Sequence, residues 1–152
     1  MSEVRWNEFG EMKTSSGMTF LYSGRPNEDD EHRNGVGILI NKKTSTSILE
    51  WRPASERIMM VRLMARVRNV SIIQCYAPTN QAEIEEKQTF YTELQDTINK
   101  VKKKDIIIVM GDLNAKIGSD NVGLEQVIGK HGLGDRNESG DLFVDWCASN
   151  EM

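Results

Sequence analysis

A run of five apolar residues, 106–110, constrains the fold of this chain more than any other feature. The residues are mostly β-branched, a charged segment precedes them, and Gly111 ends the run. Such a run predicts a strand that is buried on both faces and entered from solvent. Asp112 and Asn114 would then lie at the carboxyl end of that strand, where the ligands of α/β sheets collect. A plain turn is the alternative, because Asp and Asn also end strands by bonding to their own backbone.

The residues before this strand predict a series of shorter strands. Apolar and polar residues alternate within 58–66, and polar turns separate it from its neighbours, so an antiparallel meander is the simplest topology. The expected fold is an α/β (α+β) sandwich of two packed, mostly antiparallel β-sheets flanked by helices, an incomplete version of a four-layer arrangement. The strand at 106–110 is expected to pair with the strand that ends at Tyr76. The other expected strands cover residues 4–6, 18–23, 35–41, 47–51, 58–66 and 70–76.

After Tyr76 the apolar residues recur at steps of three and four, which predicts an amphipathic helix over 83–102 that covers one outer sheet face. Asn80 and Glu83 fit a capping box at its start. The basic residues within 100–104 suit the negative end of the helix dipole, and a phosphate-binding patch is the alternative. A last helix is expected at 141–149. The buried face of the first helix would carry Ile84, Gln88, Tyr91, Leu94, Ile98 and Val101.

The composition limits the classes of function. A chain of 152 residues that is 38% hydrophobic is long enough for one domain. Its net charge of −4 gives no general attraction to nucleic acid, so phosphate binding must be local or mediated by a metal cation. Cys75 and Cys147 have neither zinc-site spacing nor the density of a disulfide framework, which predicts reduced residues in a nuclear or cytoplasmic protein. No signal peptide and no apolar run of spanning length is seen, so no membrane partner is expected.

Three local motifs are excluded by their spacing. Residues 112–118 begin like a calcium loop, but the glycine falls at the seventh position rather than the sixth. The glycines of 129–134 lack the preceding buried strand and the Lys-Ser/Thr ending of a phosphate loop. His32 and His131 lie in polar loops and form no metal-ligand cluster with other His or Cys residues.

Three segments at strand ends form a joint pattern: Glu3 near the start, Tyr76-Ala77-Pro78-Thr79, and Gly111-Asp112-Leu113-Asn114. They resemble the endonuclease/exonuclease/phosphatase superfamily, metal-dependent phosphodiesterases with a deoxyribonuclease-I-like fold. The chain is similar in particular to the endonuclease domain of RTE-type non-LTR retrotransposons, whose host-genome copies are often named craniofacial development protein 2-like. This closer likeness also involves Arg5-Trp6, Gly35-Val36-Gly37, residues 111–118 and 131–134, Asn137, Gly140, Phe143 and Cys147.

The resemblance implies a role for four residues, which should converge at one rim of the sandwich. Glu3 would ligate Mg²⁺ or Mn²⁺, hard cations that carboxylates, waters and phosphate oxygens satisfy. Asp112 would orient or deprotonate the attacking water, and Asn114 would hold Asp112 and donate to a phosphoryl oxygen. Tyr76 would donate a hydrogen bond to the charge that develops on phosphorus. The alternatives are packing under the proline turn for Tyr76 and an ordinary exposed carboxylate for Glu3.

The sequence also departs from this family. The family's domain begins with a strand that bears an Asn and ends with strands that bear an Asp and an Asp-His element, and neither is found here. The 1–152 chain is therefore expected to be a partial domain whose open sheet edges favour self-association. Two functions stay open. One is a magnesium-dependent DNA endonuclease impaired by truncation, and the other is a non-catalytic remnant or domesticated binding fragment of a retrotransposon endonuclease.

Overall fold

The computed structural model describes residues 1–27 and 33–152, and His32 lies outside these ranges. The described chain divides into two compact units. The first unit joins Met1–Tyr76 to Thr92–Gly111, and the second joins Ala77–Tyr91 to Asp112–Met152. One long helix and one strand therefore contribute residues to both units.

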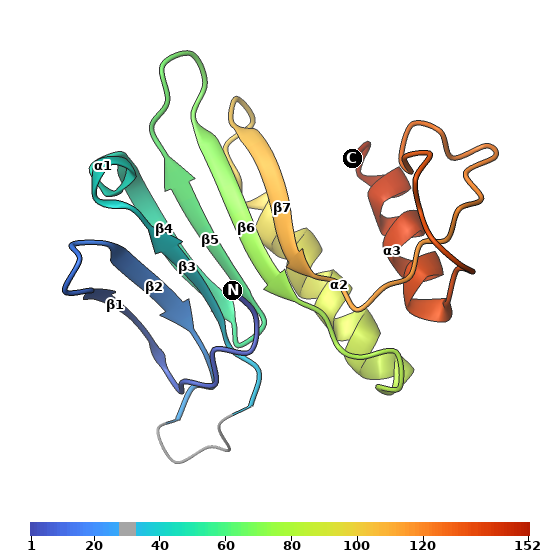
Figure 1. Cartoon of the computed structure of the whole chain (residues 1–152), viewed down its shortest axis with the longest axis horizontal. Helices are drawn as coiled ribbons and strands as arrows, with labels where there is room; N and C mark the ends of the chain where they lie inside the picture. The colour runs from blue at the N-terminus through green and yellow to red at the C-terminus, as the bar shows by residue number, and fades with distance from the viewer. Residues whose placement is uncertain (28–32) are drawn as a thin grey trace. The chain divides into compact units, whose positions relative to one another are not determined.

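Two β-sheets make up most of the first unit (Figure 1). The smaller sheet has three antiparallel strands, in the order β1 (Phe9–Lys13), β2 (Thr19–Ser23) and β3 (Val36–Ile40). The larger sheet has four strands, in the order β4 (Ile48–Ser55), β5 (Ile58–Leu63), β6 (Val70–Tyr76) and β7 (Ile106–Asp112). Strands β4, β5 and β6 form the expected antiparallel meander.

Strand β7 pairs with β6, as the sequence predicts. The two strands run parallel, because the Ile106 N–H donates to the Asn69 carbonyl at one end and the Ala77 N–H donates to the Asp112 carbonyl at the other. Gly111 has a φ of +145°, and a Cβ at this position would lie 1.8 Å from the Cys75 carbonyl oxygen. Only glycine allows β7 to approach β6 this closely.

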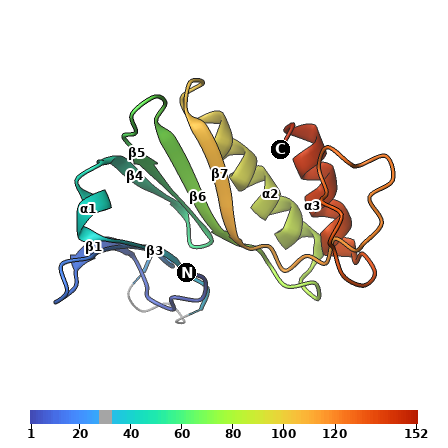
Figure 2. The ribbon, with the colours of Figure 1, turned by 45° about the horizontal axis from the view of Figure 1, so that its top comes forward.

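The two sheets pack face to face around an apolar core (Figure 2). Alternate residues of each strand point inward, because successive side chains of a strand lie on opposite faces. The fold is therefore an α+β sandwich, in agreement with the expected fold class. The core cluster contains Leu21, Val36, Ile38 and Ile40 from the smaller sheet and Met59 and Val61 from the larger one.

The prediction that the strand at 106–110 is buried on both faces is wrong. Ile106, Ile108 and Met110 keep 45%, 43% and 37% of their surface exposed. Strand β7 is the outermost strand of its sheet, so it has a neighbouring strand on one side only. Met110 lines a surface pocket together with residues of β3, which places this open apolar face on the sandwich side of β7.

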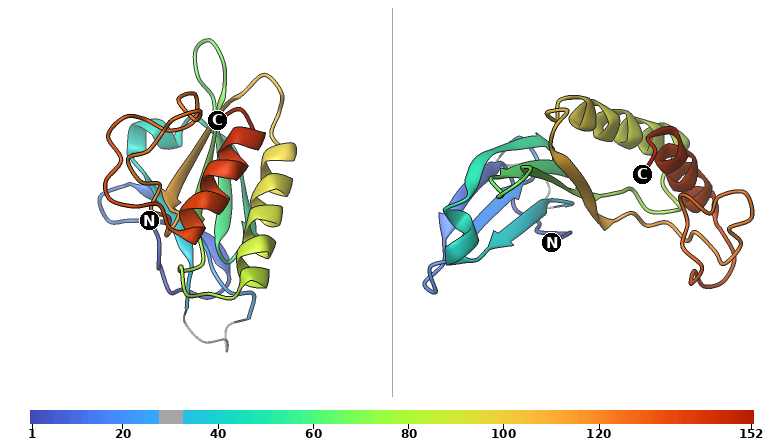
Figure 3. Two further views of the ribbon diagram at one scale, coloured as in Figure 1. Left: turned by 90° about the vertical axis from the view of Figure 1, so that its right-hand side faces the viewer. Right: turned by 90° about the horizontal axis from the view of Figure 1, so that it is seen from above.

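Helix α2 (Ile84–Asn99) is shorter than the predicted helix at 83–102, and its buried face differs from the predicted one. Its buried residues are Lys87, Phe90, Leu94 and Thr97, whereas the predicted face included Ile84 and Gln88, both of which are exposed. Figure 3 shows the 92–99 half of α2 alongside the larger sheet, with which it shares a unit.

The remaining elements differ in part from the expectations. No strand forms at 4–6; the amino-terminal segment instead contacts β3 through a bridge between Ser2 and Val36 and backbone hydrogen bonds between Met1 and Gly37. Helix α1 (Lys42–Ser45) and strand β1 were not predicted. Helix α3 (Glu138–Ser149) starts three residues before the expected 141, because the Asn137 side chain caps it by accepting from the Gly140 N–H at 2.8 Å. None of the described helices has the length and apolar character that a membrane span needs.

Candidate functional site

The first pair of predicted site residues, Glu3 and Tyr76, lies in the first unit, which contains the two sheets. The Tyr76 hydroxyl, at the end of β6, donates to Glu3 Oε1 at 2.7 Å. Glu3 Oε2 lies 3.6 Å from a guanidinium nitrogen of Arg5, and the Glu3 side chain is 51% exposed. The structure thus brings together two residues that are 73 positions apart and leaves the carboxylate open to solvent.

Backbone hydrogen bonds to the residues just before β3 and β5 position this pair. The N–H groups of Val4 and Arg5 donate to the carbonyls of Gly35 and Asn34, so the segment that carries Glu3 follows the chain that leads into β3. On β6, the Tyr76 N–H donates to the Arg57 carbonyl at 2.9 Å. The Arg57 guanidinium lies 5.6 Å from the centre of the Tyr76 ring, within the range of a cation–π contact.

The second pair, Asp112 and Asn114, lies in the other unit. The Asn114 backbone N–H donates to Asp112 Oδ1 at 2.9 Å, and the Asn114 side-chain Nδ2 donates to the Ala77 carbonyl at 2.8 Å. Asn114 has a φ of +48°, a left-handed conformation that asparagine tolerates better than most residues. The expected support of Asp112 by Asn114 therefore comes from the backbone of Asn114, while its amide ties the loop to the chain beyond β6.

The Asp112 carboxylate keeps accepting capacity for a ligand. Asp112 is exposed, and Oδ2 of its side chain has no hydrogen-bond partner among residues 1–27 and 33–152. A carboxylate that is oriented through one oxygen and open at the other has the geometry of a general base or of a cation ligand.

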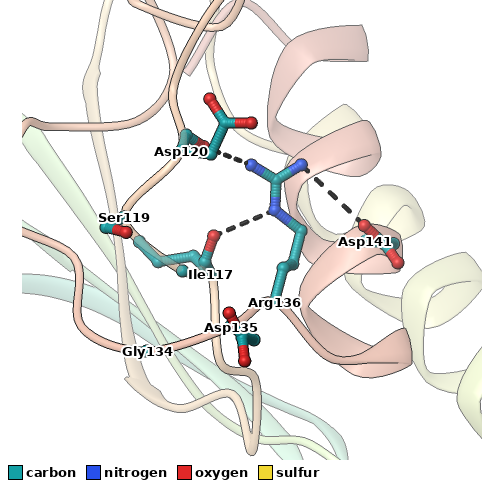
Figure 4. A pocket seen from close by; sticks show the side chains of 8 residues that line it. Ile117, Ser119, Asp120, Gly134, Asp135, Arg136 and Asp141 are labelled. Atoms are coloured by element: carbon teal, nitrogen blue, oxygen red, sulfur yellow. Dashed lines mark hydrogen bonds and ion pairs between the residues drawn. The ribbon is translucent and has the colours of Figure 1, made fainter.

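Arg136, which sequence reasoning missed, holds the loop behind Asn114 together with Asn137. Arg136 donates to the carbonyls of Ile117 and Asp120 at 2.9 and 2.7 Å and pairs with Asp141 Oδ1 at 3.8 Å (Figure 4). These contacts border a pocket of about 300 Å³ within the second unit. Asn137 Oδ1 accepts from the Lys116 N–H at 3.0 Å, so the same residue that caps α3 also anchors the start of the loop.

Buried Lys87 connects α2 and α3 within the second unit. Its Nζ donates to the Asn80 carbonyl at 2.9 Å and pairs with Glu138 Oε2 at 3.1 Å. Asn80 does not form the predicted capping box, because its side chain accepts from the Ser139 N–H at the start of α3. The sequence signal for Lys87 is its spacing, since it lies three positions before Phe90 and seven before Leu94 on the buried face of α2.

The acidic residues restrict how a metal could bind. In the described ranges, no three His, Cys, Asp or Glu side chains gather in a way that could hold a metal ion. Mg²⁺ commonly takes one or two carboxylates and completes its octahedral shell with waters. Glu3 and Asp112 fit that donor chemistry, because both are exposed carboxylates, although Glu3 is already in contact with Tyr76 and Arg5.

Comparison with known proteins identifies relatives for the whole chain. No family model matches it. All 152 residues align at 32% identity with craniofacial development protein 2 from Bos taurus and, equally, from Tragulus javanicus. The chain spans about a quarter of the length of these curated relatives, since the aligned part is 25% of each.

Proposed function

We propose that this chain is part of a metal-dependent phosphodiester hydrolase, a DNA endonuclease of the retrotransposon type. The observation that carries the proposal is the Tyr76–Glu3 hydrogen bond at the end of β6, together with the oriented Asp112 at the end of the adjacent strand β7. The similarity of all 152 residues to a quarter of craniofacial development protein 2 supports a common origin with that part of the protein.

Each of the four residues has a separate role in the proposed reaction. Asp112 accepts a proton from the attacking water through its open oxygen, while the Asn114 N–H keeps the carboxylate oriented. Glu3, placed by the Tyr76 hydroxyl, holds Mg²⁺ or Mn²⁺. When bound, the cation supplies the positive charge that a phosphoryl oxygen needs and that a chain of net charge −4 lacks. Asn114 Nδ2 keeps a second N–H for a phosphoryl oxygen, beyond the one given to Ala77.

A specific observation favours the second candidate, a non-catalytic binding fragment. The Glu3 carboxylate already has two partners, Tyr76 and Arg5, so this site is satisfied without a metal. His131, the histidine within the described ranges, forms no hydrogen bond with any of the four site residues. Within the described ranges, these contacts therefore give the site no counterpart of the histidine in the family's Asp-His element.

Nicking of supercoiled plasmid in the presence of Mg²⁺ separates the two candidates. An endonuclease nicks the plasmid, and Asp112→Ala abolishes the nicking, whereas Asp96→Ala, a matched change on the exposed side of α2, leaves it intact. We expect the 152-residue chain to nick weakly. Adding a carboxyl-terminal segment that bears the family's Asp and His should raise the rate by orders of magnitude. DNA binding without nicking by either chain would identify the binding fragment.

We also propose a second copy of this chain as a partner. Strand β7 is the outermost strand of the larger sheet and carries the exposed residues Ile106, Ile108 and Met110, and an exposed apolar edge strand favours pairing with another chain. Sedimentation should show association that Ile108→Lys weakens. A concentration-independent monomer would exclude this partner.

A further inference from the structure

A cluster of basic residues lies at the opposite end of β6 and β7 from Tyr76. Two turns meet there, one between β5 and β6 and one before β7, and Figures 1 and 2 show both turns at the same end of the sheet. Arg68 Nε donates to the Lys104 carbonyl at 2.8 Å and joins the two turns. They border a cavity of about 400 Å³, which is in the size range of small-ligand sites. Its charged lining, called here the basic pocket, consists of Arg62, Arg68, Lys102, Lys103, Lys104 and Asp105.

The positive charge of the basic pocket exceeds the negative charge that balances it. Arg62 is balanced, since Nε lies 2.6 Å from Asp105 Oδ2 and Nη1 lies 3.9 Å from Glu50 Oε1. Arg68 and the three lysines form no ion pair with any residue that the structure describes. The lining therefore carries a net positive charge, which a bound anion would neutralise.

The helix dipole does not account for these lysines. Helix α2 ends at Asn99 and has no basic residue in its last turn. The dipole's effect falls off within that turn, and Lys102 lies beyond it. The Asp105 N–H donates to the Lys102 carbonyl at 2.9 Å, so the lysines belong to a separate tight turn. Asp105 anchors this turn through two hydrogen bonds from Arg62 and one from Ser71.

We propose that the basic pocket binds a phosphate-bearing anion that carries several negative charges. Arg68 uses Nε to hold the turn and keeps its two terminal nitrogens for phosphate oxygens, and the lysines add point charges around them. A concave lining of this size fits a compact group such as a polyphosphate. The pocket is separate from the candidate active site, because the seven residues of β6 span about 20 Å. This inference does not rest on the proposed function.

Calorimetric titration of the full chain with inorganic tripolyphosphate tests the proposal, at about physiological ionic strength so that weak surface attraction is screened. We expect saturable binding of one anion. Lys103→Gln/Lys104→Gln should weaken it by about tenfold or more, and Arg68→Gln should weaken it as well. The matched control Lys42→Gln/Lys43→Gln removes the same charge from exposed positions of α1 and should leave the affinity within about twofold. Absence of saturable binding, or equal losses in both double variants, would overturn the proposal.

A competition experiment identifies where the phosphate comes from. A short DNA duplex is added to the tripolyphosphate complex without divalent metal, so that no cleavage can occur. Displacement of tripolyphosphate, lost in Lys103→Gln/Lys104→Gln, assigns the pocket to the phosphates of a nucleic-acid backbone. Retention of tripolyphosphate assigns it to a free polyphosphate group. Circular dichroism of each variant shows whether a lost affinity reflects the pocket or a lost fold, and a variant that binds normally despite its changed charge counts against the pocket.

Discussion

Two aspartates at the opposite ends of β7 have very different surroundings. Asp105, directly before the strand, is buried and accepts two hydrogen bonds from Arg62 and one from Ser71. Asp112, at the other end, is exposed, and its side chain accepts one hydrogen bond, from the Asn114 backbone N–H. The first carboxylate has its accepting capacity used within the fold, whereas the second keeps capacity for a substrate, water or cation. The contrast separates a carboxylate that stabilises from one that is available for chemistry.

The largest expected effect is on nicking activity in Asp112→Asn. The amide cannot accept the proton of the attacking water, so we expect nicking to fall by about 100- to 10,000-fold. The midpoint of thermal unfolding should stay unchanged, because the amide oxygen can still accept from Asn114. Plasmid nicking and a thermal melt measure the two quantities. A large drop in the melting temperature would instead place Asp112 with Asp105 as a structural residue.

Asp105→Asn should have the reverse effect. Arg62 would keep a neutral partner in a largely buried position, and breaking a buried ion pair is strongly destabilising. We expect the melting temperature to fall by about 10 °C, while nicking by the remaining folded protein is retained. Asp96→Asn, the same change at an exposed position of α2, serves as the control and should melt like the unchanged chain. Equal melting of the two variants would remove the structural role of the Asp105–Arg62 pair.

Lowering the pH should reveal the stabilising role of the Asp105 carboxylate in the unchanged chain. Hydrogen bonds from Arg62 hold the pKa of Asp105 below its ordinary value of 3.8; burial opposes this effect, and the Ser71 bond adds to it. The folded chain thus binds this proton less readily than the unfolded chain does. The stabilisation is complete above the ordinary pKa and is lost as the pH falls through it toward the lower folded value. Melting temperatures between about pH 5 and pH 3 should therefore fall more steeply for the unchanged chain than for Asp105→Asn. Parallel curves would contradict this.

The smallest effect is expected for Tyr76→Phe, which removes one exposed hydrogen bond to Glu3. Stability should change by at most about 1 kcal/mol. Partners of metal-binding carboxylates commonly affect metal affinity by about tenfold or more, so the Mg²⁺ concentration for half-maximal nicking should rise by about that factor. A fall in maximal rate at saturating Mg²⁺, with no change in the Mg²⁺ requirement, would instead support the role that the resemblance implies, a hydrogen bond from Tyr76 to the charge that develops at the phosphoryl group.

The strands with clear patterns were predictable, and the exceptions have physical causes. Strand β6 has the predicted bounds, and β7 lies next to it as expected. The open face of β7 was not predictable, because an apolar run does not reveal whether anything packs opposite it. Strand β1 was missed because most of its side chains are exposed, and its pairing with β2 rather than its own pattern makes it a strand. The buried face of α2 was not predicted because it includes a charged residue, Lys87.

The sequence predicts the candidate site as a set of residues but not as a set of contacts. The sequence identified Glu3, Tyr76, Asp112 and Asn114, whose catalytic and metal-binding roles stay predictions. The hydrogen bond from Tyr76 to Glu3 spans most of the sandwich chain and leaves no local signature. The role of Arg136 depends on carbonyl groups of a loop without regular structure, and residue types alone do not show where such carbonyls point.

The close approach at Gly111 has a genetic consequence. Any side chain here meets the Cys75 carbonyl, so substitution would push apart the two strands whose ends precede Ala77 and Asp112. The carboxylate of Asp112 would be present in such a variant but displaced. A screen for loss-of-function alleles should therefore recover Gly111 as often as Asp112, although position 111 has no group that could take part in a reaction.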